Sequence, residues 1–139
     1  MASVSMTTSI GAPASAVWQI IRDFNGLQKF LPAIAKSTVV GDGVGAVRTL
    51  TLQDGAEVVE RLESFDEGQQ SLSYRIVSSP LPLEGYVATM KVRPLGDARC
   101  ELAWSSTFDP KGAPEAEAKA IVEGVYAAGF EGLKKLHGA

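Results

Sequence analysis

The stretch that decides the fold is the last one, PEAEAKAIVEGVYAAGFEGLKKLH at residues 114–137. Its apolar residues recur every three to four positions, which is the period of a helix with one buried face. Pro114 suits a first helical position, acidic residues follow it, and two lysines precede Gly138 at the other end. We therefore predict one long helix of roughly 35 Å, at 1.5 Å per residue.

Three glycines, Gly124, Gly129 and Gly132, lie inside this predicted helix. Each is expected to cost about 1 kcal/mol relative to alanine in a helix interior. Two interpretations account for them. Either another part of the chain packs closely against bare helix backbone, or a cavity needs space beside the helix. The helix alone does not decide between the two.

The composition is that of an ordinary globular domain. The chain has 139 residues, 45% of them hydrophobic and 21% charged, and we interpret residues 1–139 as one domain. A net charge of -3 provides no basic surface for nucleic acid or for an anionic membrane. No run of about 20 apolar residues is present to span a membrane.

Cysteine and histidine content limits the chemistry. Cys100 is the only cysteine, and the first basic residue is Arg22, so neither a disulfide nor a signal peptide is expected. These features favour a cytoplasmic protein. His137 is the only histidine and lies near the chain end, so we expect no metal site and no histidine-based catalytic triad.

The rest of the chain alternates polar and apolar residues as strands do. A first strand at 2–10 precedes two short helical segments at 13–24 and 27–34. Further strands are predicted at 37–40, 45–52, 57–65, 71–77, 85–93 and 99–108. Short links between them favour antiparallel pairing. The order predicts an α+β fold, with an antiparallel sheet of about seven strands whose helices cover one face.

On such a sheet, alternate residues face the helices. The inward set is apolar except for Arg48, Glu60 and two tyrosines, Tyr74 and Tyr86. Buried charges are tolerated only when they are paired. Arg48 and Glu60 lie on successive strands and are placed to meet across a hairpin.

Alternation leaves the role of this pair open. The pair either fixes the register of the sheet or, if the register is shifted by one residue, lies in water. The functional interpretation is a polar patch inside an apolar pocket for a small molecule. Since the long helix would cover this face, Tyr126, Gly129 and Phe130 become candidates for the pocket wall, and the cavity interpretation of the glycines is favoured.

Residues 78–85, SSPLPLEG, form a stiff loop between two predicted strands. The loop has two prolines, and we expect its leucines to be exposed. Such a loop either covers the mouth of a pocket or provides a surface for a partner, with a homodimer through residues 80–83 as one possibility.

The order of elements resembles the START-like (SRPBCC) superfamily. The blocks VWQIIRDFNGLQKFLPAI, GVGAVRTLTL, VERLESFDE, LSYRIVSSPLPLEGYVATM and CELAWSSTFDP carry this resemblance. Within the superfamily the chain is most similar to the polyketide cyclase/dehydrase branch, which includes plant lachrymatory factor synthase and the abscisic acid receptors. The resemblance covers essentially the whole chain and implies the helix-grip fold, in which a sheet wraps around a long C-terminal helix and encloses a ligand cavity.

The resemblance also implies roles for particular residues. The family's arginine and glutamate match Arg48 of GAVR and Glu60 of VERLESFD, and its pocket tyrosine matches Tyr86 of EGYVATM. In lachrymatory factor synthase the arginine and glutamate are thought to transfer a proton. The gating loop of the receptors has no counterpart here, because only residues 53–56 separate two strands. A hormone-sensing role is therefore not expected.

Two functions follow from these observations. The first is an enzyme that needs no cofactor and that cyclises, dehydrates or isomerises a small hydrophobic substrate, with Arg48, Glu60 and Tyr86 as catalytic residues. The alternative is a binding or carrier protein for a hydrophobic small molecule or lipid, without catalysis. In both, the expected ligand contacts are Tyr74, Met90, Trp104, Tyr126, Gly129 and Phe130.

Overall fold

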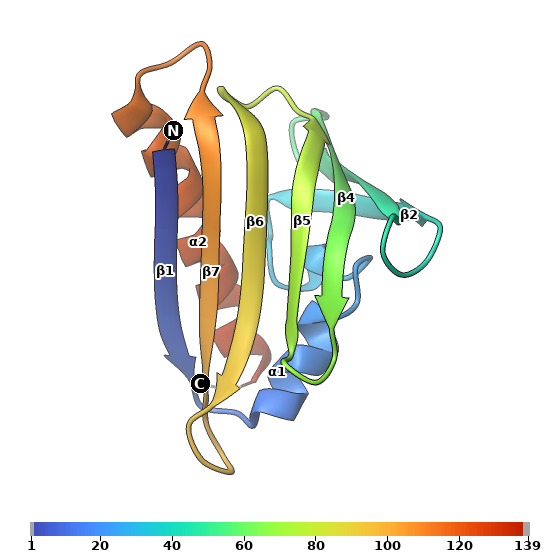
Figure 1. Ribbon diagram of the computed structural model, residues 1–139, viewed down its shortest axis with the longest axis vertical. Coiled ribbons are helices and arrows are strands. Elements are labelled where there is room, and N and C mark those ends of the chain that lie inside the picture. The colour runs from blue at the N-terminus through green and yellow to red at the C-terminus, as the bar shows by residue number, and fades with distance from the viewer. Residues whose placement is uncertain (1, 138–139) are drawn as a thin grey trace.

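The computed structural model describes residues 2–137 and is organised by one seven-stranded antiparallel sheet (Figure 1). Its strands are β1 (Ala2–Ile10), β2 (Ile34–Val40), β3 (Val47–Leu52), β4 (Glu57–Asp66), β5 (Ser71–Ser78), β6 (Leu83–Pro94) and β7 (Cys100–Pro110). The strand order is β1-β7-β6-β5-β4-β3-β2, so successive hairpins build the sheet and β1 returns to pair with β7. The predicted antiparallel sheet is confirmed.

The long helix α2 (Glu115–Leu136) lies across one face of this sheet (Figure 1). It begins one residue later than predicted, because Pro114 has an extended backbone and caps the helix instead of opening its first turn. Two acidic residues in the first turn and two lysines in the last suit the helix dipole as expected. The helix buries Ala118, Val122, Tyr126, Gly129, Phe130 and Leu133.

The segment after β1 is less helical than predicted. It contains α1 (Ala14–Ile21) and a single turn of 3-10 helix, η1 (Leu27–Lys29). The chain leaves the helix after Ile21 because Asp23 forms a local turn. Its carboxylate accepts the Asn25 N–H at 3.0 Å, and its carbonyl accepts the Gly26 N–H at 2.9 Å. The predicted pair of short helices is thus one helix and one turn.

The strands alternate as predicted. In β6 the buried residues are Leu83, Tyr86, Ala88, Met90 and Val92, and in β4 they are Val58, Glu60 and Leu62. Register shifts in the β2–β3, β4–β5 and β6–β7 pairs bend the strands. In Figure 1, β2 accordingly runs at a steep angle to β1 and β7. The curved sheet therefore presents a concave face to α2.

The three glycines of α2 divide between the two interpretations. A Cβ on Gly132 would lie 1.9 Å from the carbonyl oxygen of Phe30, and one on Gly129 would lie 2.6 Å from Cζ3 of Trp104. A Cβ on Gly124 would meet nothing within 4 Å. Close packing explains the first two glycines, and open space surrounds the third.

Candidate ligand cavity

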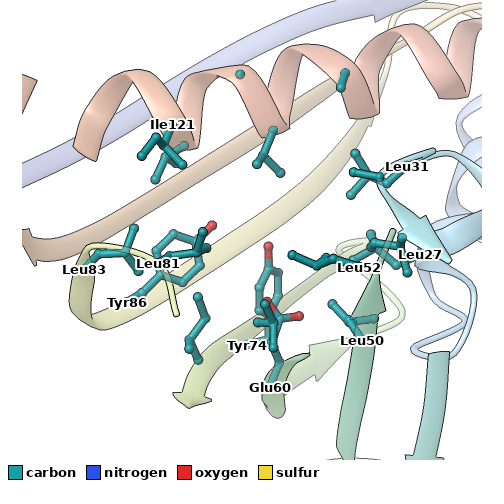
Figure 2. Close-up of a pocket in the computed structure, with 18 of the residues that line it drawn as sticks. Leu27, Leu31, Leu50, Leu52, Glu60, Tyr74, Leu81, Leu83, Tyr86 and Ile121 are labelled. Atoms are coloured by element: carbon teal, nitrogen blue, oxygen red, sulfur yellow. The ribbon is translucent and has the colours of Figure 1, made fainter. Parts of the chain in front are cut away.

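A cavity of about 330 Å³ lies between α2 and the concave face of the sheet (Figure 2). Most of its wall is aliphatic. The residues from η1 to β5 that line it with hydrocarbon are Leu27, Leu31, Ala33, Ile34, Leu50, Leu52, Val58 and Ile76. The loop before β6, β6 itself and α2 complete this surface with Leu81, Leu83, Ile121, Val122, Gly124, Val125 and Ala128.

Four wall residues carry polar atoms: Glu60, Tyr74, Tyr86 and Trp104. Figure 2 shows Glu60 and Tyr74 projecting from the sheet toward α2, with Tyr86 beside Leu81. All four belong to the inward set of strands β4 to β7. The polar atoms therefore lie together on the sheet side of an otherwise oily space, which is the usual composition of a small-molecule pocket.

Glu60 is held by Arg48, its direct partner across the β3–β4 pair. Nε of Arg48 donates to Oε1 of Glu60 at 2.8 Å, and Nη2 lies 2.6 Å from the same oxygen. Both residues are buried, with 4% of Arg48 and 6% of Glu60 exposed. Both of these contacts with Arg48 use Oε1, and neither uses Oε2.

Arg48 itself stands behind the wall. Its Nη1 donates to the carbonyl of Phe24 at 3.1 Å, and its guanidinium lies 4.0 Å from the ring centroid of Phe24 and 4.9 Å from that of Tyr74. Arg48 is not among the residues that line the cavity. Arg48 therefore lies behind Glu60, outside the surface that borders the cavity.

The tyrosines form hydrogen bonds at the inner end of the cavity. Trp104 donates its indole N–H to the hydroxyl of Tyr74 at 3.1 Å, and the hydroxyls of Tyr86 and Tyr126 are bonded to each other. Burial raises the pKa of Tyr74 and of Tyr86 well above the ordinary value, and it raises the pKa of Tyr126 to about 12. All three hydroxyls are therefore protonated and able to donate at neutral pH.

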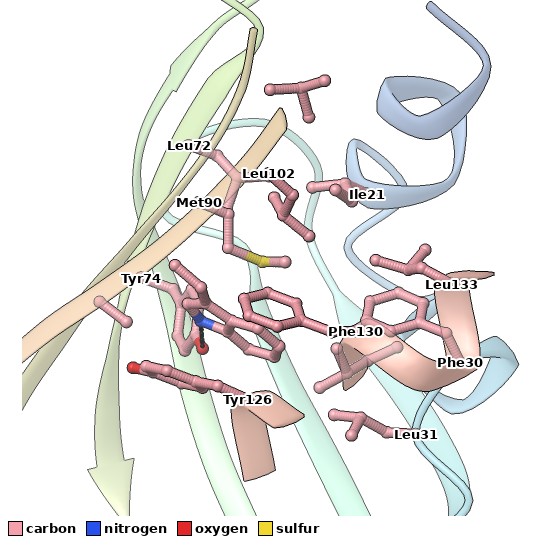
Figure 3. Close-up of a cluster of buried hydrophobic side chains, with 14 of the residues drawn as sticks. Ile21, Phe30, Leu31, Leu72, Tyr74, Met90, Leu102, Tyr126, Phe130 and Leu133 are labelled. Atoms are coloured by element: carbon pink, nitrogen blue, oxygen red, sulfur yellow. Dashed lines mark hydrogen bonds between the residues drawn. The ribbon is translucent and has the colours of Figure 1, made fainter. Parts of the chain in front are cut away.

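The residues proposed from the sequence fall into two groups. Glu60, Tyr74, Tyr86 and Trp104 line the cavity, with Arg48 behind them. The structure does not place Met90, Tyr126, Gly129 or Phe130 in the wall. Met90, Tyr126 and Phe130 belong instead to a packed hydrophobic cluster (Figure 3), in which Tyr126 stacks on Trp104 at 4.3 Å between ring centroids. Gly129 lies against the ring of Trp104.

The aliphatic wall was not recognised from the sequence. Leu27, Leu31, Ile121 and Val125 have the spacing of ordinary core residues, so nothing in the pattern separates them from packed neighbours. The one available signal was Gly124, a glycine on the α2 surface that turns out to border open space.

The leucines of the predicted loop at residues 78–85 are not exposed as expected. Leu83 is buried, Leu81 is half-buried, and both line the cavity. The cavity gives their side chains an apolar surface to contact, so they turn inward. Pro80 remains exposed, and a homodimer through this loop would have Pro80 at its contact.

The short turn between β3 and β4 is fixed to the opposite rim of the cavity. The backbone N–H of Gln53 donates to the carbonyl of Ala33 at 3.0 Å, and its side-chain amide donates to the carbonyl of Pro32 at 3.1 Å. Two hydrogen bonds therefore hold the turn against the segment that leads into β2.

A curved antiparallel sheet closed over a long C-terminal helix, with an apolar cavity between them, defines a helix-grip protein with a site for a hydrophobic ligand. A family model described as polyketide cyclase/dehydrase and lipid transport matches residues 1–138. The chain belongs to this family, as its resemblance predicted. Among residues 2–137, no helix is long and apolar enough to cross a membrane.

Known relatives share both sequence and shape with this chain. The abscisic acid receptor PYL2 of Arabidopsis thaliana is 32% identical over 131 residues, which cover 86% of this chain and 69% of the receptor. The structure of XoxI from Bacillus cereus has a TM-score of 0.92 at 31% identity, with 98% of this chain and 95% of that one covered. Norcoclaurine synthase of Thalictrum flavum, solved with dopamine and hydroxybenzaldehyde, has a TM-score of 0.72 at 25% identity, covering 97% and 85%.

Proposed function

We propose that the protein binds a small, largely apolar molecule in this cavity and that Glu60 moves a proton on it. The observation that carries the proposal is the position of Glu60. Among the residues that line the cavity, it is the one charged side chain, and Arg48 holds it by one oxygen. A carboxylate fixed in an apolar site is suited to general base catalysis on a bound substrate.

The geometry suggests separate roles for Glu60 and the tyrosines in the proton transfer. The other carboxylate oxygen of Glu60, Oε2, would take a proton from a carbon next to a ligand carbonyl, and the electron pair would move onto the carbonyl oxygen. A protonated tyrosine, Tyr74 or Tyr86, would donate a hydrogen bond to that oxygen. Return of the proton to another carbon completes an isomerisation. In a cyclisation, the enolate carbon would instead attack a second carbonyl of the ligand, and the proton held by Glu60 would pass to the alkoxide oxygen formed there.

The geometry favours Arg48 as the residue that holds Glu60 over a direct role at the oxyanion. Its donors are used by Glu60 and by the carbonyl of Phe24, and it stands outside the cavity wall. It would therefore act as a positioning residue that orients Glu60, while the tyrosines stabilise the oxyanion.

The alternative is a carrier that binds the same class of molecule unchanged. The mostly aliphatic wall favours it, since such a surface retains an apolar ligand whether or not Glu60 reacts. The named relatives include a receptor and a synthase, so they support both possibilities.

Deuterium exchange separates the two. Beta-tetralone is a neutral, apolar ketone with acidic carbon-bound protons, and its uptake of deuterium from heavy water can be followed by mass spectrometry. We expect the protein to accelerate exchange by about a hundredfold, the usual scale of general base catalysis. Glu60→Gln should remove the acceleration while the ketone still binds.

The matched control is Glu63→Gln. Glu63 lies on the same strand, pairs with Arg61 at 3.0 Å and is not part of the cavity wall, so exchange should be unaffected. Full acceleration in Glu60→Gln would end the proposed role of Glu60. A wild-type protein that binds the ketone without accelerating exchange would favour the carrier.

A further inference from the structure

We infer that the cavity takes neutral ligands that carry a hydroxyl group, alcohols or phenols, and rejects carboxylates of the same shape. The inference rests on the proposed function insofar as it assumes that this cavity is the ligand site. It does not depend on catalysis, because it concerns which molecules bind.

The first observation is the absence of an available cation. The residues that line the cavity include Glu60 and contain no lysine, arginine or histidine. Arg48, the nearest guanidinium to Glu60, is 4% exposed and is enclosed by Glu60, by the carbonyl of Phe24 and by the rings of Phe24 and Tyr74. An incoming carboxylate would find no positive partner inside the cavity.

Helix α2 does not supply one either. The part of α2 that lines the cavity runs from Ile121 to Ala128, whereas its free N–H groups and positive dipole end lie in the first turn after Pro114. The tyrosines Tyr74 and Tyr86 are neutral, because burial raises the pKa of each well above its ordinary value. A buried carboxylate would thus be unpaired and would face the like charge of Glu60, both of which are costly.

The second observation concerns what Glu60 needs. An ionised carboxylate only accepts hydrogen bonds, and both contacts from Arg48 go to Oε1. The other oxygen is best satisfied by a ligand donor, and such charge-assisted bonds are about twice as strong as neutral ones.

A hydroxyl group suits both sides of this site. It can donate to Glu60 and accept from a tyrosine. Tyr74 already receives the indole N–H of Trp104, so its own proton is left to donate elsewhere. The cavity has a volume of about 330 Å³ and a wall rich in leucine, so the remainder of the ligand would be one or two apolar rings or a short alkyl chain.

Three probes of matched shape test the inference by isothermal titration calorimetry at neutral pH. Para-butylphenol offers a neutral donor, para-butylanisole lacks the donor, and para-butylbenzoate is an anion. We expect the phenol to bind tightest, the anisole about tenfold more weakly because a bond to a charged acceptor is lost, and the benzoate more weakly still. Benzoate binding equal to or tighter than that of the phenol overturns the inference, and so does equal binding of phenol and anisole or no binding of any probe.

Variants assign the preference to Glu60. Glu60→Gln leaves Arg48 without its partner, so we expect benzoate to gain affinity and phenol to lose it. If that variant does not fold, the double variant Arg48→Met/Glu60→Leu removes both charges, and the gap between phenol and anisole should close. An unchanged gap in whichever variant folds would contradict the assignment, and Glu63→Gln should keep the wild-type order.

The outcome is distinguishable from that of the exchange experiment. If the probes bind in the expected order but the protein does not accelerate deuterium exchange, the inferred ligand class stands and the proposed catalytic role is wrong. If the protein accelerates exchange but binds benzoate best, the proposed catalysis stands and the inferred ligand class is wrong.

Discussion

Both halves of α2 contain glycines, but the glycine in one half borders a cavity and those in the other half allow close packing. In the half around Gly124, the helix borders the cavity, and the space beside that glycine is open. In the half around Gly129 and Gly132, the bare backbone lies against Trp104 and against the carbonyl of Phe30. A glycine inside a helix therefore indicates either a cavity or a close contact, and one helix can contain both.

Trp104 forms the boundary between these halves. One face of its ring stacks on Tyr126 in the packed half, at 4.3 Å between centroids and with 17° between the planes. Its N–H reaches Tyr74 in the cavity wall. The packed half thus serves as the rigid support that orients the polar groups of the open half. The following predictions test this division, from the largest expected effect to the smallest.

The largest effect is expected from Arg48→Met at the open half. The substitution leaves Glu60 buried without its charged partner, which should lower the free energy of unfolding by about 3–5 kcal/mol. Urea denaturation followed by circular dichroism measures the change. The double variant Arg48→Met/Glu60→Leu should recover most of the loss, and a single variant as stable as wild type would contradict the account of the pair.

Gly132→Ala tests the packed half. The new methyl group would meet a backbone carbonyl that cannot rotate away, so helix and 3-10 segment must separate. We expect a loss of about 2–3 kcal/mol in the free energy of unfolding. Urea denaturation again provides the measurement, and wild-type stability would mean that the close approach is absent.

Gly124→Ala and Gly129→Ala form a matched pair within one helix. Alanine at 124 enters open space and should stabilise the protein by up to about 1 kcal/mol through its better helix propensity. Alanine at 129 must displace the ring of Trp104. It should therefore destabilise the protein by about 1 kcal/mol, even after the same gain in helix propensity is included. Thermal melts compare the two variants. Shifts of the same sign would remove the distinction between the halves.

The last effect is nil at neutral pH and appears only at alkaline pH. Burial raises the pKa of Tyr126 to about 12, from an ordinary value near 10 in the unfolded chain. The folded state thus holds this proton more tightly, so its contribution to stability is complete below about pH 10 and is lost as the pH rises to about 12. The free energy of unfolding should fall as the pH rises across this interval, and it should fall less steeply in the Tyr126→Phe variant than in the wild type. Equal slopes for both proteins would contradict the assignment.

Backbone periodicity explains how much was predictable. Because side chains alternate along any strand, the pattern favoured the covered face for Arg48 and Glu60 but left a one-residue shift of register open. The structure pairs the two residues directly across β3 and β4. The antiparallel sheet and the long helix followed from similarly local rules. Two features depended on details of the turns: the extended backbone of Pro114, and residues 27–34, which were predicted to be helical and form one 3-10 turn before β2 begins at Ile34.

The division of the interior was not predictable in this way. Tyr126 and Val125 are adjacent on α2, yet the first packs on Trp104 and the second borders the cavity. Which side chain meets a neighbour depends on the curvature of the sheet and on residues distant in sequence. For the same reason, the sequence placed Arg48 inward but did not show that it stands behind Glu60.

The most direct test of the cavity is a methyl-detected NMR titration of the protein with para-butylphenol. The account predicts saturable shifts for methyl groups of the open half, Ile76, Leu81 and Val125, while those of Met90 and Leu133 in the packed half stay in place. Shifts centred on Met90 and Leu133, or no saturable shift in the open half, would contradict the central claim that the protein binds its ligand in this cavity.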